Sequence, residues 1–335
     1  MMGELKPLAL TMGEPSGIAG EIVAKAWTGD GRPVPPFVYL GDAAWLRAET
    51  HHLRRHTHII EVGNCRDAVS RFADGIPVLS VPLVQKPVHG KPAIANGPAV
   101  IESIRRAIAL TRSGDACAIV TNPIHKASLY AAGFNFPGHT EFLAAESGAQ
   151  SPVMMLSIEG LRVVPVTVHL SLAEAIKALD AASIVRTAIV LHQALQRDFA
   201  IANPRLAIAA LNPHAGESGA MGKEEQTIIS PAIQELQRGG VNASGPYPAD
   251  TLFHAASRRR FDAVVCMYHD QALIPLKTLD FHGGVNTTLG LPFVRTSPDH
   301  GTAFDIAGQG CADASSLLAA MRLAAEMSAA PLARA

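Results

Sequence analysis

The chain has 335 residues, of which 48% are hydrophobic and 17% are charged, a balance typical of globular and not of disordered proteins. Its formal net charge of −1 excludes the strongly basic surface with which proteins bind nucleic acid or acidic membranes, so we expect neither partner. A chain of this length can bury a large core and divide into two domains.

The cysteines and the first residues of the chain indicate the cellular compartment. Cys65, Cys117, Cys266 and Cys311 are far apart and form no CxxC pair, so we expect buried free thiols in a reducing environment. Glu4 and Lys6 come early, no long apolar stretch occurs near the start, and no run of about 18 apolar residues occurs in the chain. We therefore expect a cytoplasmic protein without a membrane segment.

In the first half of the chain, short apolar runs alternate with amphipathic stretches of helical length. The sequence predicts strands at 8–12, 37–40 and 116–120 and helices at 18–27 and 97–111. A glycine- and proline-rich turn at 13–17 follows the first strand, and the segment 81–98 is predicted to be a loop.

The second half repeats this alternation. A hairpin around Glu159 and Gly160 is predicted to join strands at 153–156 and 161–168. The remaining predicted strands are 206–210 and 263–267, the predicted helices are 182–197, 223–238 and 313–329, and a loop is predicted at 243–248. Alternating strands and helices predict an α/β fold with a largely parallel sheet in each part.

Three of the 14 histidines occupy equivalent positions. His169 lies at the end of the apolar run VVPVTVHL, His214 ends LAIAALNPH, and His269 ends AVVCMYH. Each follows a predicted strand, and open α/β sheets bind ligands along the carboxyl ends of their strands. Neutral imidazoles suit Zn²⁺ and similar ions, so the pattern predicts a three-histidine metal site. Three separate loop histidines, each hydrogen-bonded, are the alternative.

A different group, His51, His52, His56 and His58, lies in a polar stretch with two arginines. We interpret it as a solvated surface, although His52 and His56 have the i, i+4 spacing of a metal pair.

Other polar groups are typical of an anion site. Lys277, Asn286 and Arg295 follow His269 among glycines and a proline, and the two cations suit phosphate or carboxylate. His139 and Thr140 open a helical run, where they either cap the helix or offer donors to an anion. The turn 121–126 brings further donors after a strand.

Several common sites are excluded. The run GESGAMGKE has the wrong spacing for a P-loop, and Glu stands where Ser or Thr must meet Mg²⁺. Gly308-Gln309-Gly310 lacks the third glycine of a Rossmann fingerprint, and no GxSxG elbow occurs.

Taken together, these stretches resemble the 4-hydroxythreonine-4-phosphate dehydrogenase family of pyridoxal phosphate biosynthesis. The matching segments, in order, are LTMGEPSGIAGEI, TNPIHK, PGHTEFLA, VTVHL, LNPHAGE, PADTLF, MYHDQALIPLK and GVNTTLGLPFVRTSPDHGTAFDIAG, and they cover nearly the whole chain. The resemblance implies two α/β/α domains with a cleft between them, as in isocitrate and isopropylmalate dehydrogenases. It also implies a homodimer with shared active sites.

We accordingly expect domain 1, with the termini and the cofactor loop, at 1–135 plus 290–335. Domain 2, with the metal histidines and the dimer interface, is expected at 136–289.

The resemblance also assigns roles to residues. The expected ligands of a divalent metal (Zn²⁺, Mg²⁺ or Co²⁺) are His169, His214 and His269. The expected substrate contacts are His139, Thr140, Lys277, Asn286 and Arg295. The loop expected to hold NAD or NADP contains His300, Gly301, Thr302, Ala303 and Gly308. Candidates for moving a proton are Lys277, Asp250 and Asp270.

The implied reaction oxidises 4-phosphooxy-L-threonine, a phosphorylated hydroxy-amino acid, at C3 with NAD(P)⁺. The keto acid formed then loses CO₂, in the synthesis of pyridoxal 5′-phosphate. One alternative is a related dehydrogenase of threonate or erythronate 4-phosphate, or of a cis-diol carboxylate. A second alternative, from another class, is a three-histidine zinc hydrolase.

Overall fold

The computed structural model describes residues 5–55, 57–136 and 138–330, and the chain separates into two compact units. Unit 1 comprises Met1–Gln150 and Leu291–Ala329, and unit 2 is built from Ser151–Gly290. His56 and Pro137, which fall in two of the motifs above, lie outside the described residues.

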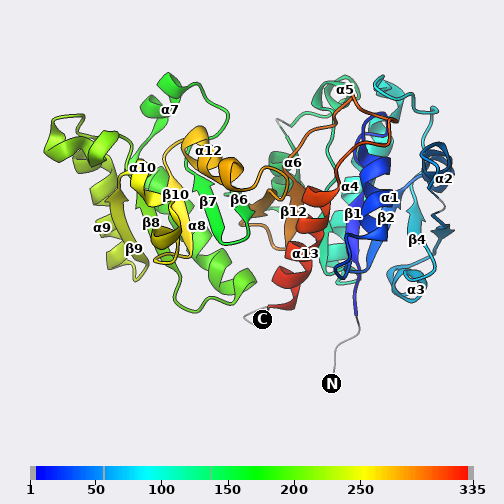
Figure 1. Ribbon diagram of the computed structural model, residues 1–335, viewed down its shortest axis with the longest axis horizontal. Coiled ribbons are helices and arrows are strands. Elements are labelled where there is room, and N and C mark those ends of the chain that lie inside the picture. The colour runs from blue at the N-terminus through cyan, green and yellow to red at the C-terminus, as the bar shows by residue number, and fades with distance from the viewer. Residues whose placement is uncertain (1–4, 56, 137, 331–335) are drawn as a thin grey trace. The chain divides into compact units, whose positions relative to one another are not determined.

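Unit 1 is an α/β sandwich whose strand pairs are parallel (Figure 1). Its strands run in the order β3-β4-β2-β1-β5-β12. They are β1 (Leu8–Thr11), β2 (Phe37–Gly41), β3 (Ile59–Glu61), β4 (Ile76–Ser80), β5 (Ala118–Val120) and β12 (Arg295–Pro298). The predicted strands of the first half are confirmed, and β1, β2 and β5 are buried throughout, as expected for a sheet covered on both faces.

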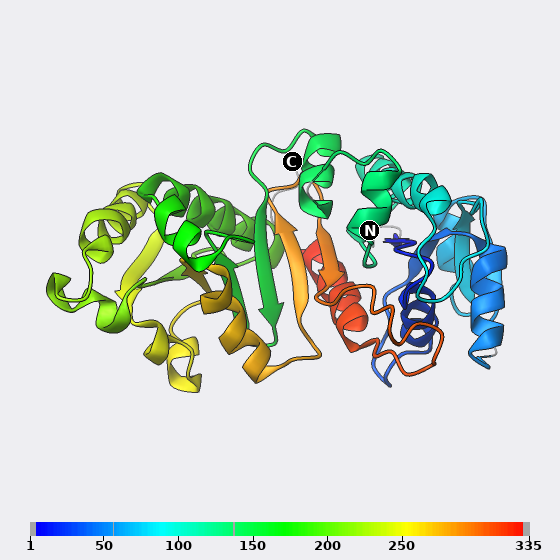
Figure 2. The ribbon, with the colours of Figure 1, turned by 90° about the horizontal axis from the view of Figure 1, so that it is seen from above.

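Helices cover both faces of this sheet, with α1 and α13 on one side and α4 on the other (Figure 2). The helices are α1 (Ala19–Thr28), α2 (Ala43–His52), α3 (Cys65–Arg71), α4 (Gly97–Arg112), α5 (Lys126–Ala131), α6 (His139–Ser147) and α13 (Ser315–Ala329), with a 3₁₀ turn η1 (Ile94–Asn96). The carboxyl-terminal helix α13 packs on β12 and β5, so the end of the chain completes the core of the amino-terminal unit.

The boundary between the units differs from the expected one, because residues 136–150 belong to unit 1. Helix α6 packs there against α4. The Phe142 ring lies 5.0 Å from the Phe134 ring, and Arg105 on α4 donates to Glu146 at 3.3 Å.

Unit 2 contains a mixed sheet in the order β11-β6-β7-β10-β8-β9. Its strands are β6 (Val153–Ile158), β7 (Leu161–Pro165), β8 (Arg205–Ala209), β9 (Asn242–Tyr247), β10 (Ala263–Cys266) and β11 (Val285–Leu289). The predicted hairpin joins β6 and β7, and β11 also pairs antiparallel with β6. Only β7, β10, β8 and β9 are mutually parallel, so the expectation of a largely parallel sheet holds for that part of unit 2.

The helical segments of unit 2 are α7 (Leu172–Ala178), α8 (Ala181–Phe199), α9 (Ser230–Arg238), α10 (Ala249–Leu252), α11 (Ala255–Arg258) and α12 (His269–Leu279), with η2 (Pro213–Gly219) and a π turn η3 (Glu225–Ile229). Alternate strand residues face opposite layers. Val164 packs in the core with α8 and α9, and its neighbour Val163 packs in the core with α12.

One prediction in unit 2 is wrong. The segment 243–248 is mostly strand β9 and not a loop, because it pairs with β8 despite its glycine and proline. The helix expected at 223–238 is confirmed, because the π turn η3 continues into α9 with helical backbone at Ile229 and Ser230. Pro231, near the start of α9, has no N–H for the helical ladder, and the π turn lies directly before it.

All four cysteines are free, as expected. Cys65 and Cys266 are buried, but Cys311 is exposed and Cys117 is partly buried, so the expectation of burial fails for those two. Among the described residues, no helix is long and apolar enough to cross a membrane.

Candidate active site

Arg295 is a charged residue inside unit 1. It opens β12, is 3% exposed, and donates from Nε and Nη2 to the Thr121 hydroxyl at 3.1 and 2.6 Å. Thr121 follows β5, the strand that pairs with β12. Burial lowers the pKa of the guanidinium to about 10, which still leaves it protonated at neutral pH. A planar guanidinium can bind two oxygens of a phosphate or a carboxylate at once.

His139, the first residue of α6, is the second component of this group. Its Nε2 is buried and has no hydrogen-bond partner, although other parts of the residue are accessible. Burial, together with the positive charges of Arg295 and Lys126, holds the pKa of His139 well below its ordinary value. The imidazole is therefore neutral at pH 7, and its unpartnered nitrogen is available to a ligand. Thr140, the next residue, is half-buried.

Loops from both parts of unit 1 meet at the carboxyl ends of β1 and β12. The backbone N–H of Ile18 donates to the Thr302 carbonyl at 3.1 Å, and a Cβ on Gly17 would lie only 2.6 Å from that oxygen. The buried Oγ of Ser16 and the buried Nε2 of His300 have no hydrogen-bond partner. Buried polar atoms without partners are uncommon, so these two atoms are candidates for contact with a bound molecule.

The segment from His300 to Gly308 is fixed at its far end by two histidines. His52 Nε2 lies 3.0 Å from the Gly308 carbonyl, and His89 packs so closely that any Cβ on Gly308 would clash with its ring. Glu49 in turn holds His89 Nε2 at 2.8 Å. His52 therefore has a specific contact, beyond the solvated role expected from the sequence. Ala303, within the segment, has a left-handed φ of 44°.

In unit 2, His169, His214 and His269 follow β7, β8 and β10, which are neighbouring parallel strands with β10 in the middle. The carboxyl ends of these strands lie along one edge of the sheet. This topology places the three histidines at the same edge, where open α/β sheets bind ligands.

Two of these histidines lie close together. The rings of His169 and His269 are 6.0 Å apart, and both line a cavity of about 190 Å³ together with Thr167, Tyr268 and Asp270. Asp270 Oδ1 lies 2.7 Å from His269 Nδ1, which leaves His269 Nε2 available to a metal.

The third histidine, His214, lies in a segment with unusual backbone geometry. Residues 214–218 all have left-handed φ values: 52, 54, 76, 40 and 57°. His169 is also left-handed, with a φ of 54°. A non-glycine residue in this conformation costs roughly 1–2 kcal/mol, and such strain is concentrated at functional sites. In the part of the chain that the structure describes, no three metal-binding side chains are close enough to share one ion.

The remaining predicted residues of unit 2 are more dispersed. Lys277 lies on α12 with its Nζ 5.2 Å from the centre of the Phe281 ring. The Oδ1 atom of Asn286, on β11, is buried without a hydrogen-bond partner. Asp250 is exposed at the start of α10. Unit 1 thus holds Arg295, His139, Thr140 and the segment 300–308, and unit 2 holds the histidines, Lys277, Asn286, Asp250 and Asp270.

Some residues of these groups were missed in the sequence. The turn 121–126 was expected only to bring further donors near the site. In the structure, Thr121 accepts hydrogen bonds from Arg295, and the charge of Lys126 helps to lower the pKa of His139. Its position directly after a predicted strand was the available signal. Glu14 and Ser16 carried no such signal beyond the glycine-rich turn, and burial raises the pKa of the Glu14 carboxyl.

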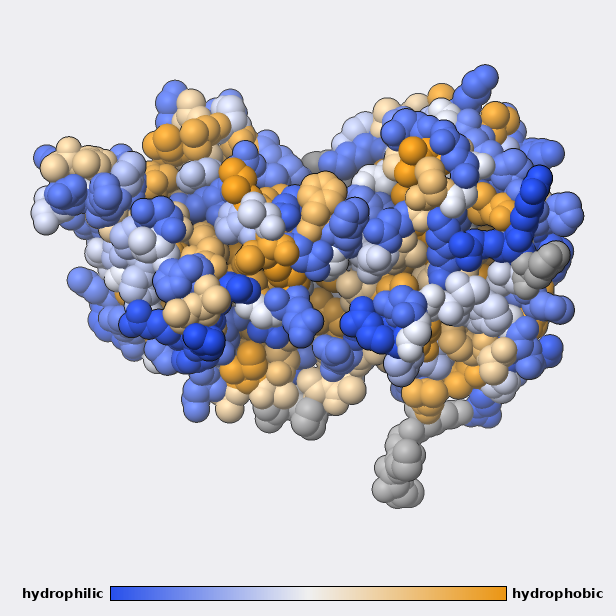
Figure 3. All heavy atoms as spheres, in the orientation of Figure 1, coloured by the Kyte–Doolittle hydropathy of each residue, from blue (hydrophilic) through white to orange (hydrophobic). Residues whose placement is uncertain are grey.

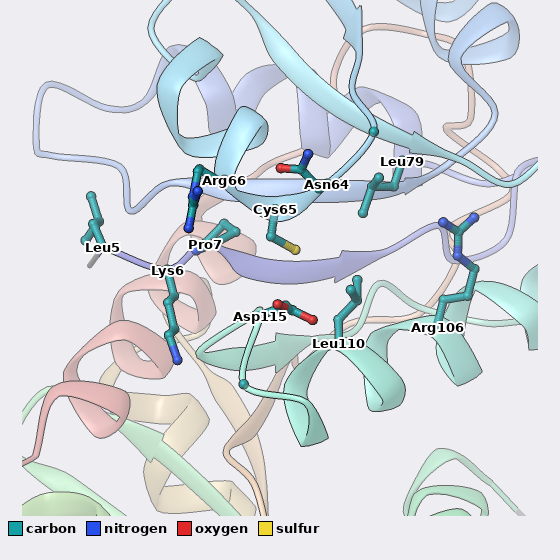
Figure 4. Close-up of a pocket in the computed structure, with 12 residues that line it drawn as sticks. Leu5, Lys6, Pro7, Asn64, Cys65, Arg66, Leu79, Arg106, Leu110 and Asp115 are labelled. Carbon is teal, nitrogen blue, oxygen red and sulfur yellow. The ribbon is translucent and has the colours of Figure 1, made fainter. Parts of the chain in front are cut away.

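A separate cavity of about 400 Å³ lies in unit 1 (Figure 4). It is lined by Lys6, Arg66, Arg106, Asp115 and Cys65, among others, and by none of the predicted site residues. Burial, and secondarily the charge of Asp115, raises the pKa of the Cys65 thiol to about 11, so this thiol is protonated at neutral pH.

Comparisons with known proteins find a matching family and similar structures. Residues 33–324 match the family described as pyridoxal phosphate biosynthetic protein PdxA. A relative from Caulobacter vibrioides, named 4-hydroxythreonine-4-phosphate dehydrogenase, is 51% identical over 330 residues, which make up 97% of this chain and 98% of that protein.

Two solved structures are also similar. A 4-hydroxythreonine-4-phosphate dehydrogenase from Klebsiella pneumoniae has a TM-score of 0.87 at 37% identity, covering 96% of this chain and 99% of that one. A terephthalate 1,2-cis-dihydrodiol dehydrogenase from Burkholderia xenovorans has a TM-score of 0.65 at 31% identity, covering 96% and 98%.

Proposed function

The chain belongs to the family of the pyridoxal phosphate biosynthetic protein PdxA, and from this premise we propose that it oxidises 4-phosphooxy-L-threonine at C3. In the proposed reaction NAD⁺ or NADP⁺ accepts the hydride. The product, 2-amino-3-oxo-4-phosphooxybutanoate, loses CO₂ to give 3-amino-2-oxopropyl phosphate. The dehydrogenase names of the relatives disfavour the zinc hydrolase alternative.

The observation that carries this proposal is the buried cationic group of unit 1. Arg295 is held by Thr121, and His139 presents an unpartnered Nε2 beside it. A planar guanidinium can bind two oxygens of a phosphate or a carboxylate at once. A neutral imidazole can donate a further hydrogen bond without adding charge. We assign Arg295, His139 and Thr140 to one anionic end of the substrate, and Lys277 and Asn286 to further substrate contacts.

We assign a divalent ion, Zn²⁺, Mg²⁺ or Co²⁺, to His169, His214 and His269. Their fit rests on their donor chemistry, on the 6.0 Å approach of two rings and on the left-handed backbone at His169 and His214. When bound, such an ion lowers the pKa of a hydroxyl group. Asp270 contributes by orienting His269 through Nδ1. Lys277, with Asp250 as the alternative, is our candidate for moving the proton of the C3 hydroxyl.

The segment from His300 to Gly308 is our candidate for the adenosine end of the dinucleotide. The unpartnered atoms of Ser16 and His300 support this assignment, as does the fixation of Gly308 by His52 and His89.

We further propose that the enzyme is a cytoplasmic homodimer with shared active sites. Exposed apolar side chains on and beside α7 and α12 support a dimer interface on unit 2 (Figure 3). They are Leu170, Leu172, Ile176, Ile274 and Phe281.

The test is direct. Protein mixed with a divalent metal, NAD⁺ or NADP⁺ and 4-phosphooxy-L-threonine should produce NADH or NADPH absorbance. His214→Ala should lose both bound metal and turnover. If this variant kept the metal content and the rate of the parent protein, the metal assignment would be wrong.

A second candidate substrate class follows from the similarity to the terephthalate 1,2-cis-dihydrodiol dehydrogenase. Arg295 could bind the carboxylate of a cis-diol acid as well as a phosphate. A panel of 4-phosphooxy-L-threonine, threonate and erythronate 4-phosphate, and an unphosphorylated cis-diol carboxylate separates the classes. Turnover of the cis-diol alone would replace the proposed substrate, while the dehydrogenase assignment would stand.

A further inference from the structure

The segment that carries His214 needs an explanation beyond its own sequence. Residues 214–218 are all left-handed, and only Gly216 among them adopts this conformation without steric cost. A run of such residues persists only where the surrounding structure fixes it. The fixing group must therefore contact the segment or the residues that lead into it.

Glu225, on the π turn, is that group. Its side chain is buried, with the residue 4% exposed, and Oε1 accepts the backbone N–H groups of Leu211 at 2.9 Å and Asn212 at 2.7 Å. Its second oxygen, Oε2, accepts Nδ2 of Asn212 at 3.0 Å. One carboxylate therefore fixes the two residues that come directly before Pro213 and His214.

The same carboxylate also contacts the middle of the left-handed run. A Cβ on Gly216 would lie 2.5 Å from Oε2, so only glycine fits against the carboxylate at this position. The π turn contributes because its extra residue per turn changes the direction in which side chains project. Buried carboxylates are costly unless they are fully hydrogen-bonded, and here three N–H donors satisfy Glu225.

We propose that Glu225 is a positioning residue for the metal site. It fixes the backbone of the segment 211–218, which carries His214, at the sheet edge before a metal binds. This inference rests on the proposed assignment of His214 as a ligand. It gives Glu225 no contact with the metal or the substrate.

Glu224 supplies a matched control. It is the preceding residue in the chain, has the same side chain, is only half-buried, and accepts Nδ2 of Asn212 at 2.7 Å without bonding to the backbone of Leu211 or Asn212. Glu225→Gln keeps the shape of the side chain, but its neutral amide has only one acceptor oxygen, so it can no longer accept all three N–H donors and it bonds the backbone N–H groups more weakly. Glu224→Gln makes the equivalent change without affecting the backbone anchor.

The experiment uses Co²⁺ as a spectroscopic probe, titrated into metal-free full-length protein and followed by visible absorption. We expect Glu225→Gln to raise the Kd for Co²⁺ by about 10- to 100-fold, as for other residues that orient metal ligands. We expect Glu224→Gln to change this Kd by less than about twofold. Hydrogen exchange of the metal-free protein supplies a second readout. The amides of Leu211 and Asn212 should exchange at least about tenfold faster in Glu225→Gln, while those of β10 keep their rates.

The outcomes separate this inference from the proposed function. If His214→Ala binds Co²⁺ as tightly as the parent protein, the proposed metal site itself is wrong. If His214→Ala loses Co²⁺ but Glu225→Gln keeps the parent Kd, the metal site stands and the positioning role is overturned, even if the Tm of Glu225→Gln falls. Should Glu225→Gln fail to fold, Glu225→Asp decides. Its shorter side chain keeps the charge but moves the carboxylate away from the backbone N–H groups of Leu211 and Asn212. We expect a Kd for Co²⁺ about 3- to 10-fold higher, and an unchanged Kd again overturns the role.

Discussion

At the scale of single residues, Arg295 shows how binding and stability can oppose one another. Its guanidinium is buried, and burial lowers its pKa to about 10, so the charge is held in an environment that disfavours it. Replacing buried charges with apolar residues of similar size is often neutral or stabilising.

We therefore predict that Arg295→Met keeps the free energy of unfolding within about 1 kcal/mol of the parent value or raises it. The same change should weaken substrate binding by about 10- to 150-fold, since hydrogen bonds to charged groups contribute roughly 1.5–3 kcal/mol. Chemical denaturation and a substrate titration check the two parts. A variant that binds substrate normally would remove Arg295 from the site.

His139 gives a prediction about pH. Its pKa is held well below 6.5 in the folded protein, so between that depressed value and 6.5 the unfolded chain binds more protons than the folded one. The neutral His139 therefore contributes to the free energy of unfolding fully above pH 6.5, and this contribution is lost as the pH falls toward the pKa of His139 in the folded protein. The slope for one proton is at most about 1.4 kcal/mol per pH unit.

The measurement compares the Tm of the parent protein and of His139→Gln from pH 7.5 to 5. We expect the parent to lose stability more steeply on acidification, because glutamine does not titrate. Parallel curves would show that His139 is not held neutral by its surroundings.

At the scale of elements, helix α13 shows how the last segment of the chain supports a site built mostly by the first. Leu317 and Met321 are fully buried under the sheet of unit 1. The buried Thr296 hydroxyl on β12 donates to the Ala320 carbonyl at 2.8 Å, which ties α13 to the strand that Arg295 opens.

We predict that Leu317→Ala lowers the free energy of unfolding by about 2–5 kcal/mol, because it removes buried methyl groups and leaves a cavity. Glu326→Ala, an exposed position on the same helix, should stay within about 0.5 kcal/mol of the parent. Urea denaturation measures both. An equal loss of stability in the two variants would mean that the buried face of α13 does not stabilise the protein more than its exposed face.

At the scale of the whole molecule, the exposed apolar side chains of unit 2 favour self-association. Phe281 is 68% exposed at the end of α12, and Lys277 lies over its ring. Exposed aromatic residues are enriched at interfaces, where a few residues often contribute most of the binding energy.

We predict that Phe281→Asp weakens the proposed homodimer by about tenfold or more, since a carboxylate buried at an interface is costly. Val84→Asp is the control, because Val84 is 79% exposed in unit 1, away from these residues in the chain. Sedimentation velocity over a range of concentrations compares the two variants with the parent. Dissociation by both variants, or by neither, would place the interface elsewhere.

Much of the local structure could be predicted from the sequence alone. Apolar runs such as Ala263–Cys266 and the amphipathic stretch 97–111 determined strands and helices, because burial on a sheet or on one helix face imposes a fixed period. The motifs placed His169, His214 and His269 after strands and linked the chain to its family. These predictions depend only on residues that are close together in the sequence.

Other features required the tertiary structure, because they depend on contacts between distant segments. The sequence did not indicate that β10 lies between β7 and β8, or that Thr121 is the partner of Arg295, 174 residues away. It also placed 136–150 in the wrong unit, since the packing of α6 on α4 leaves no periodic signal. The left-handed segment at His214 was equally unpredictable. Four of its five residues disfavour that conformation, and the distant carboxylate of Glu225 supplies the hydrogen bonds that fix the chain beside it.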